Sequence, residues 1–228
     1  MNQVSFNLLA ISIFTVVMAT LLGPLIHLSP VVPALAVAGA MTLAAFDTLG
    51  WQNRGSTLLL DAIARFSPEH RDRVLHHEAG HFFVAHMLGI PITGYTLSAW
   101  EAFRQQQFGA GGVSFDTSKL EAEVSTGQIA AQRVDQYCQV WMAGIAAEQL
   151  VYGNAEGGEG DRDQIRLLWT ALKRPLAEAE LKQRWAALQA KTLLETNRDR
   201  YEALVEQMRQ KAPVEACKAV LDQSVQVS

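Results

Sequence analysis

Hydrophobic residues dominate the first fifty positions, where the first charged side chain is Asp47. Two apolar runs, at about 5–28 and 31–50, are separated by a Ser-Pro dipeptide, and Asp47 near the end of the second is their only charged residue. Each run is long enough for a helix that crosses a hydrocarbon core of ~30 Å, which takes roughly 20 residues. This pattern predicts a membrane anchor over residues 1–54, built as a transmembrane helical hairpin in contact with membrane lipid.

The basic residues predict the orientation of this hairpin. Arg54, Arg65, Arg71 and Arg73 all follow the second run, and no basic residue precedes the first. Because basic segments beside membrane helices stay on the cytoplasmic side, we expect a two-pass integral membrane protein whose remaining chain lies in the cytoplasm, stroma or matrix. A cleaved signal peptide is the alternative for the first run, but that run lacks a basic start and exceeds the usual ~7–15 apolar residues.

Helix signals become frequent after the apolar runs. Over residues 67–89, Ser67 is an N-cap candidate and Pro68 suits the first helical position. Gly89 suits a left-handed C-cap, and Pro91 follows it. We therefore predict one helix over this range.

The rest of the chain predicts a small sheet followed by helices. A short helix is expected at 56–66, and β-branched and aromatic residues around a Gly-rich stretch at 92–115 predict two or three short strands. The chain then has a helical pattern from about 125 to 151 and again from about Asp161, with breaks at two later prolines. We expect a mostly α fold with a small β-sheet (α+β), in which residues 55–228 form one domain.

The overall charge excludes one class of partner. The net charge is −4 and the isoelectric point is near 5.9, so no nucleic-acid partner is predicted. Cys138 and Cys217 lie far apart in the sequence and match neither a disulfide framework nor a zinc knuckle. We expect them to be reduced thiols packed as small hydrophobic groups.

The segment HHEAGH, at residues 76–81, carries the chemistry of the predicted helix. His77 and His81 are four positions apart, so on a helix their imidazoles lie one turn apart and can bind a single zinc ion. Glu78 is rotated by about 100° from His77, so its carboxylate can reach the open position of the metal as a general base. This H-E-x-x-H spacing predicts zinc as the cofactor and Glu78 as the catalytic residue.

The third zinc ligand must come from another part of the chain, because a hydrolytic zinc site uses three protein ligands. Two acidic regions can supply it. One is Glu148 in MAGIAAEQLVYG, and the other is the turn EGGEGDRDQ, which contains Asp161 and Asp163. From the residues alone, these alternatives stay open.

Several blocks of the sequence resemble the peptidase domain of the FtsH-type membrane zinc metalloproteases. RVLHHEAGHFFVAHMLG is similar to the zinc helix of that family, MAGIAAEQLVYG to the helix that follows, and EGGEGDRDQIRLLW to the loop with the last zinc ligand. The resemblance covers roughly residues 67–222 and implies a zincin-like helical peptidase domain.

The resemblance also implies a ligand set. In that family the ligand aspartate lies four residues after a loop glycine and opens a helix, which corresponds here to Asp161 after Gly157. A small difference in the loop would instead make Asp163 the ligand. Glu148 is then expected to hydrogen-bond a ligand histidine or a helix end rather than to bind zinc.

The chain departs from the family in one respect, because FtsH proteins carry an ATPase module and this sequence contains no G-x-x-x-x-G-K-[ST] motif. We expect a membrane-anchored zinc metalloendopeptidase that hydrolyses flexible or membrane protein segments without its own ATPase. Its expected partners are a polypeptide substrate, a separate ATPase or FtsH-like protein, and further copies of itself. The alternative is a proteolytically inactive binding or scaffold protein in a membrane complex.

Overall fold

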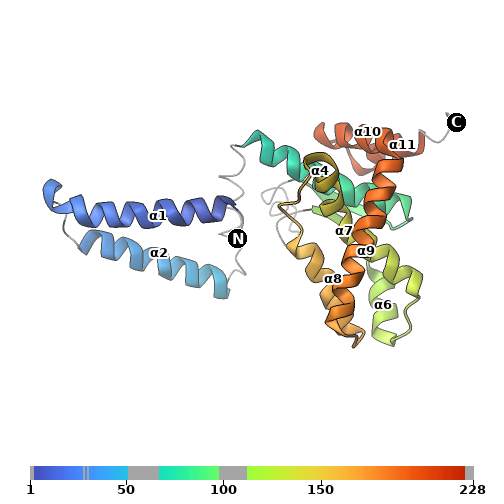
Figure 1. The fold of residues 1–228 in the computed structure, drawn as a ribbon, viewed down its shortest axis with the longest axis horizontal. Coiled ribbons are helices and arrows are strands. Elements are labelled where there is room, and N and C mark those ends of the chain that lie inside the picture. Colours follow the sequence, from blue (N-terminus) through green and yellow to red (C-terminus); the bar gives the residue numbers. More distant parts are fainter. Residues whose placement is uncertain (1–2, 28, 30, 51–66, 98–111, 224–228) are drawn as a thin grey trace. The chain divides into compact units, whose positions relative to one another are not determined.

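A computed structural model describes residues 3–27, 29, 31–50, 67–97 and 112–223 of the chain (Figure 1). Helices predominate among these residues, and one small antiparallel sheet accompanies them. The prediction of a mostly α fold with a small β-sheet is therefore confirmed.

The chain divides into two compact units. The first contains residues 1–68 and 98–110, and the second contains residues 69–97 and 111–228. The predicted domain boundary after residue 54 lies outside the described residues.

Two helices and a short turn form the described part of the first unit. Helix α1 (Gln3–Leu22) ends where a 3-10 turn, η1 (Gly23–Ile26), begins, and helix α2 (Val31–Gly50) follows. The two helices contact each other and run side by side. Many of their large apolar side chains are exposed, including Phe14, Leu21, Leu35 and Met41.

The prediction that these helices form a transmembrane hairpin is wrong. A membrane span needs roughly 20 apolar helical residues. Among the residues that the structure describes, no helix combines the length and apolar character needed to cross a bilayer. The predicted two-pass membrane placement, with the second domain on the cytoplasmic, stromal or matrix side, is corrected by this finding.

Helix α4 (Pro68–Met87) carries the H-E-x-x-H segment and begins at the predicted proline. The chain leaves it through Gly89, whose φ of +69° is left-handed. Glycine adopts this conformation without steric cost, which is why it commonly follows the last turn of a helix. The helix predicted over 67–89 is confirmed.

The sheet consists of β1 (Ile92–Thr96) and β2 (Gly112–Phe115), which pair antiparallel with Tyr95 opposite Val113. The register shifts once, between Ile92 and Gly94. Two or three strands were predicted over 92–115, and residues 98–111 between β1 and β2 lie outside the described residues, as does the short helix predicted at 56–66.

Six helices follow the sheet within the described residues. They are α6 (Ser118–Thr126), α7 (Ala131–Tyr152), α8 (Glu159–Ala171), α9 (Leu176–Thr196), α10 (Arg198–Arg209) and α11 (Val214–Gln223).

The predicted breaks in this helical region are correct except at its start. Pro175 and Pro213 directly precede α9 and α11, as predicted. The helix expected from about residue 125 is instead divided, because Gly127 has a left-handed φ of +68° and ends α6. Helix α7 then starts at Ala131.

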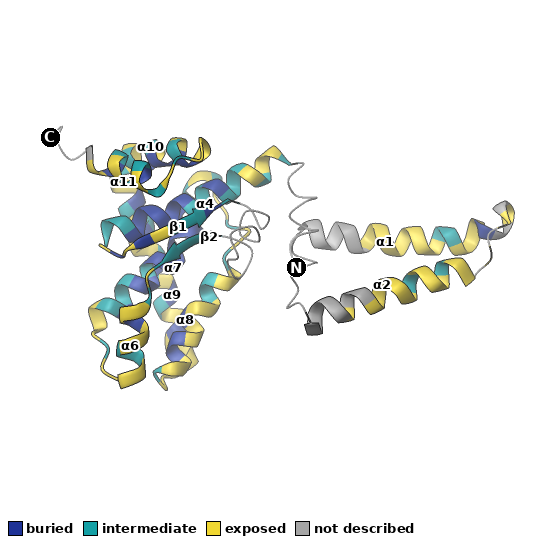
Figure 2. Cartoon of the chain, turned by 180° about the vertical axis from the view of Figure 1, so that it is seen from behind, coloured by how far each residue is buried: buried dark blue, intermediate teal, exposed yellow. Residues whose placement is uncertain are grey.

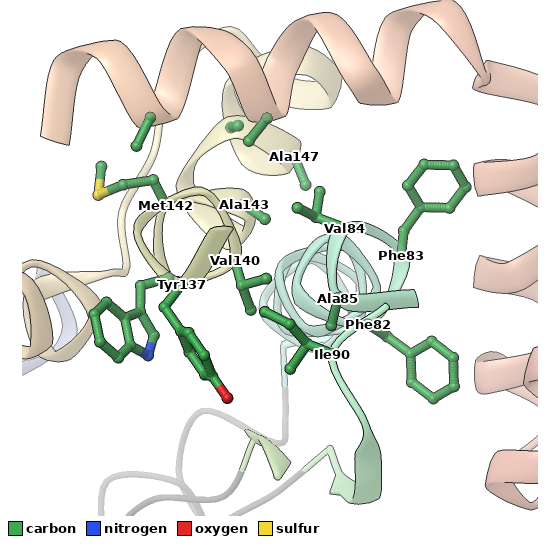
Figure 3. Close-up of a cluster of buried hydrophobic side chains, with 14 of the residues drawn as sticks. Phe82, Phe83, Val84, Ala85, Ile90, Tyr137, Val140, Met142, Ala143 and Ala147 are labelled. Carbon is green, nitrogen blue, oxygen red and sulfur yellow. The ribbon is translucent and has the colours of Figure 1, made fainter. Parts of the chain in front are cut away.

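The core of the second unit lies where α4 and α7 cross. Buried residues gather on these two helices (Figure 2). Val84 of α4 lies beside Val140 and Ala143 of α7 in this cluster (Figure 3). Gly80 allows the close approach, because an added Cβ would lie only 2.5 Å from the carbonyl oxygen of Ala143. The crossing therefore holds the H-E-x-x-H helix directly against α7.

Candidate metal centre

Three side chains from two helices converge in the second unit. His77 and His81 come from α4, and Asp161 comes from the first turn of α8. The Nε2 atom of His77 is 3.1 Å from Oδ2 of Asp161, and the Nε2 atom of His81 is 3.5 Å from Oδ1 of the same carboxylate. One ligand atom from each residue lies within 4.8 Å of the others, so this group can hold a metal ion.

The spacing of these atoms fits a small divalent cation. Zinc binds imidazole nitrogen at ~2.0–2.1 Å and carboxylate oxygen at ~2.0–2.2 Å, so two donors at corners of a tetrahedron lie roughly 3.3 Å apart. The distances from His77 to Oδ2 of Asp161, 3.1 Å, and from His81 to Oδ1 of the same carboxylate, 3.5 Å, are each close to this value. The donor set, two imidazoles and one carboxylate, is one that zinc accepts in hydrolytic sites.

Both histidines are held by their other ring nitrogen. Nδ1 of His81 is 2.7 Å from the carbonyl oxygen of Val140, and Nδ1 of His77 is 2.7 Å from Oε1 of Glu148. A carbonyl oxygen only accepts hydrogen bonds, so Nδ1 of His81 carries the proton. In the neutral imidazole this leaves the Nε2 lone pair free for a metal, and the same holds for His77 beside an ionised Glu148.

One face of α7 supplies these contacts. Val140, Gly144 and Glu148 are spaced by four residues, which places them in a row along the helix. Gly144 lies under the ring of His77, where an added Cβ would be 2.4–2.6 Å from three ring atoms. Only glycine leaves room for this imidazole, so the shape of α7 fixes the position of His77.

The turn before α8 brings Asp161, and not Asp163, to the histidines. Gly158 precedes the helix with a left-handed φ of +91°, and Asp161 lies in the first turn, where a carboxylate interacts favourably with the helix dipole. Asp163 is exposed and forms an ion pair with Arg166 at 2.8 Å.

The charges of the cluster stabilise one another in the absence of a metal. Burial disfavours the imidazolium form of His77, but hydrogen bonds to Asp161 and Glu148 outweigh it and raise its pKa to about 10. The pKa of His81 is also raised, because the attraction of Asp161 exceeds the cost of burial. The two histidines in turn hold the pKa of the Asp161 carboxyl well below its usual range, against the effect of its own burial. A divalent cation would replace the protons as the positive charge.

Glu78 lies beside the cluster and contacts the sheet. The backbone N–H of Val113 in β2 donates a hydrogen bond to Oε2 of Glu78 at 3.0 Å. Gly112 passes close to the same carboxylate, since an added Cβ would lie 3.3 Å from Oε2. Burial raises the pKa of Glu78, although the neighbouring histidines oppose that shift. A raised pKa brings a carboxylate closer to the range useful for proton transfer at neutral pH.

Glu148 lies on the far side of His77 from Asp161 and does not belong to the three-residue group. Its Oε2 accepts hydrogen bonds from Arg73 at 3.1 Å and from the N–H of Glu156 at 2.9 Å. Burial raises the pKa of this carboxyl, but the hydrogen bonds from His77, the Glu156 N–H and Arg73 lower it to about 2. Glu148 is therefore an anion that orients an imidazole.

Two other histidines of α4, His76 and His86, have different partners. Nδ1 of His76 is 2.9 Å from the hydroxyl oxygen of Tyr201, and Nε2 of His86 is 3.0 Å from Oδ1 of Asp222. Both connect α4 to the C-terminal helices rather than to the candidate metal centre.

Four further residues contribute to this site that were not predicted from the sequence: Val140, Gly144, Val113 and Arg73. Two of them carry a spacing signal, because Gly144 lies four residues before Glu148 and Arg73 lies four residues before His77. The contacts of Val140 and Val113 are made by backbone atoms, so no side-chain pattern reveals them.

No protein-family model matches this chain, and no curated protein matches it. The expected relation to FtsH-type proteases therefore depends on the sequence blocks alone.

Proposed function

We propose that this protein is a zinc-dependent metallopeptidase whose metal is held by His77, His81 and Asp161. One observation supports this most strongly: the Nε2 atoms of both histidines face one carboxylate, while their Nδ1 atoms are fixed by separate acceptors. Such an arrangement suits metal binding, because it fixes the tautomer and the direction of each ring.

The reaction requires a base beside the metal, and Glu78 is the residue proposed for that role. Zinc, when bound, supplies Lewis acidity toward the scissile carbonyl and makes water more acidic. Glu78 accepts the proton of the attacking water and later delivers it to the leaving amine. Its hydrogen bond from Val113 holds the carboxylate in place while its burial favours proton uptake.

The proposed substrate is an extended, flexible polypeptide. In the described part of the chain β2 pairs with one strand only, so its other edge can receive a further strand through backbone hydrogen bonds. Recognition of this kind reads the backbone and gives little sequence preference. A folded substrate would need a separate unfolding partner, consistent with the missing ATPase motif.

The test measures zinc content and hydrolysis of an unstructured polypeptide by the full chain. We expect one zinc ion per chain and chelator-sensitive hydrolysis in the wild type. Glu78→Gln should retain zinc and lose at least about 100-fold in kcat, because general base catalysis contributes roughly 10²–10⁴. Glu202→Gln is the matched control, since Glu202 is exposed and pairs with Arg198; it should behave as wild type.

Two outcomes contradict the proposal in different ways. A wild-type protein that binds no zinc would contradict the proposed metal centre itself. Zinc-loaded wild type and Glu78→Gln with equal, chelator-insensitive rates would support the alternative function, a binding or scaffold protein in which the metal is structural.

A further inference from the structure

Arg73 connects helix α4 to the segment between α7 and α8. Its Nη1 atom lies 3.1 Å from Oε2 of Glu148 and 3.2 Å from both the carbonyl and the side-chain oxygen of Asn154. Its Nη2 atom lies 3.3 Å from the same side-chain oxygen and 3.4 Å from Oε1 of Glu156. The guanidinium group stacks on Tyr152, 4.4 Å from the ring centroid. One planar group therefore contacts four residues of a single stretch, 148–156.

The contact with Glu148 leads directly to a proposed zinc ligand. One carboxylate oxygen of Glu148 accepts a hydrogen bond from Arg73, and the other lies 2.7 Å from Nδ1 of His77. The Glu148 side chain is almost completely buried, with 2% of its surface exposed, whereas that of Arg73 is 17% exposed. A buried carboxylate keeps its charge and its orientation only when both oxygens are paired. Arg73 and the N–H of Glu156 provide that pairing on the side away from His77.

The remaining contacts hold the chain that leads to the third ligand. Asn154 and Glu156 lie between the end of α7 and Gly158, the residue that precedes α8. Gly157 packs beside both Glu148 and His77, because an added Cβ would lie 3.1 Å and 3.5 Å from their nearest atoms. Any shift of this segment would therefore move Asp161 relative to the histidines.

We propose that Arg73 is a positioning residue that sets the affinity of the centre for zinc by holding Glu148 against His77. This inference rests on the proposed metal site. Two effects of Arg73 oppose each other: its orientation of Glu148 favours the metal, while its positive charge repels a nearby cation. We expect orientation to dominate, because Glu148 and Glu156 neutralise the charge at short range.

The experiment measures the zinc dissociation constant of the metal-free full chain by competition with a chromophoric chelator. Arg73→Met removes the charge and the hydrogen bonds while keeping a long apolar side chain. It should weaken zinc binding by about 10–100-fold, the loss typical when the partner of a ligand histidine is disturbed. Arg73→Lys keeps the charge but loses the planar fork, and it should also weaken binding, by a smaller factor. If repulsion dominated, Arg73→Met would tighten binding and Arg73→Lys would leave it unchanged, and the inference would be overturned.

A double-mutant cycle tests the route through Glu148. In a Glu148→Gln background, Arg73→Met should cause little further loss of zinc affinity, since the carboxylate that it orients is gone. Equal losses in both backgrounds would overturn that route. Thermal unfolding of the metal-free variants separates affinity from a general loss of structure.

The matched control is Arg209→Met. Arg209 forms an ion pair at 2.7 Å with Asp72, the residue that precedes Arg73 on α4. This variant should match the wild type in zinc affinity. A wild type that binds no zinc overturns the metal centre and the role of Arg73 together, whereas zinc-binding variants with unchanged affinity overturn only the role of Arg73.

Discussion

The two faces of helix α7 bury different kinds of groups. Toward α4, the helix presents the carbonyl of Val140, the bare backbone of Gly144 and the carboxylate of Glu148 to two histidines. Figure 3 shows Met142 on the side of α7 that is turned away from α4. On a side that meets α9, Asp135 pairs with Lys182.

One helix can therefore hold the candidate metal site with one face and stabilise the fold with another. Contacts on the α4 face depend on the direction of each hydrogen bond and on the space left for each ring, because both imidazoles must point their Nε2 atoms at one metal position. Contacts on the other face are dominated by burial of apolar area, which is not directional. We therefore expect substitutions on the α4 face to change metal affinity most, and substitutions on the opposite face to change the free energy of unfolding.

The largest effect is expected from Gly144→Ala. The new Cβ would lie within 2.4–2.6 Å of three atoms of the His77 ring. The ring cannot move aside without leaving Glu148 or Asp161, which contact its two nitrogens. We expect at least about a 100-fold loss of zinc affinity, more than is usual for an indirect contact.

The control for that variant is Gly160→Ala. Gly160 lies in α8 next to Asp161, and an added Cβ there would meet no atom within 4 Å. This change should leave zinc affinity unaltered and stabilise the helix by about 0.5–1 kcal/mol. Equal zinc affinity in the two glycine variants would contradict the role assigned to Gly144.

Met142→Ala probes the opposite face. Met142 is 3% exposed, and loss of a buried side chain of this size costs about 2–5 kcal/mol through lost burial and the cavity left behind. Urea unfolding of the metal-free chain measures this loss. Zinc affinity should stay within about twofold of wild type, and Met142→Leu should cost less than about 1.5 kcal/mol. A Met142→Ala variant that lost zinc affinity but not stability would contradict the different roles assigned to the two faces of α7.

Local signals in the sequence predicted much of the second unit. Pro68, Gly89, Pro175 and Pro213 mark helix ends through backbone geometry alone, and each lies next to a helix end in the structure. The break at Gly127 escaped prediction because a single glycine inside a helical pattern is often tolerated. A proline thus marks a helix boundary reliably, whereas a lone glycine inside a helical pattern leaves the boundary ambiguous.

The candidate site was predictable only in part. The spacing of His77 and His81 follows from helix geometry, and the Gly-rich turn before Asp161 suggested a third ligand. Arg73 and Gly144 could not be assigned, because their roles arise where α4 and α7 cross, and a sequence pattern does not specify that crossing. The apolar runs at the start of the chain were misleading in another way, since no helix among the described residues combines the length and the apolar character of a membrane span.

Zinc binding should release a proton from His77. Without metal, the pKa of His77 is raised to about 10, so this imidazole is protonated near neutral pH and must lose a proton when zinc binds. Zinc affinity should therefore rise with pH by at least about tenfold per unit between about pH 6.5 and 8.5, and it should be lost as pH falls. Calorimetry in buffers of different ionisation enthalpy counts the protons released, and a pH-independent affinity would contradict the buried imidazolium.

The same pKa shift of His77 makes the stability of the metal-free chain depend on pH. The pKa of His77 is about 10 in the folded chain, against an ordinary value of 6.5 for histidine. Between these values the folded state binds more protons than the unfolded state, so stability falls as pH rises through this window. Below about pH 6.5 the contribution is fully present. Bound zinc should remove this dependence, because the imidazole is then neutral at every pH in the window.

The smallest effect is expected from Lys182→Met on the α9 side of α7. Lys182 pairs with Asp135 and lies 3.7 Å from the centroid of the Trp185 ring. The Asp135 side chain is 37% exposed, so solvent screens the pair and its contribution is about 0–1 kcal/mol. Methionine keeps the apolar stem of the lysine, so we expect a loss of about 1 kcal/mol at low salt and less at high salt. Lys191→Met, which removes a more exposed pair with Glu195, should have no measurable effect. A change in zinc affinity in Lys182→Met would mean that the two faces of α7 are coupled, because no contact described for Lys182 reaches the histidines.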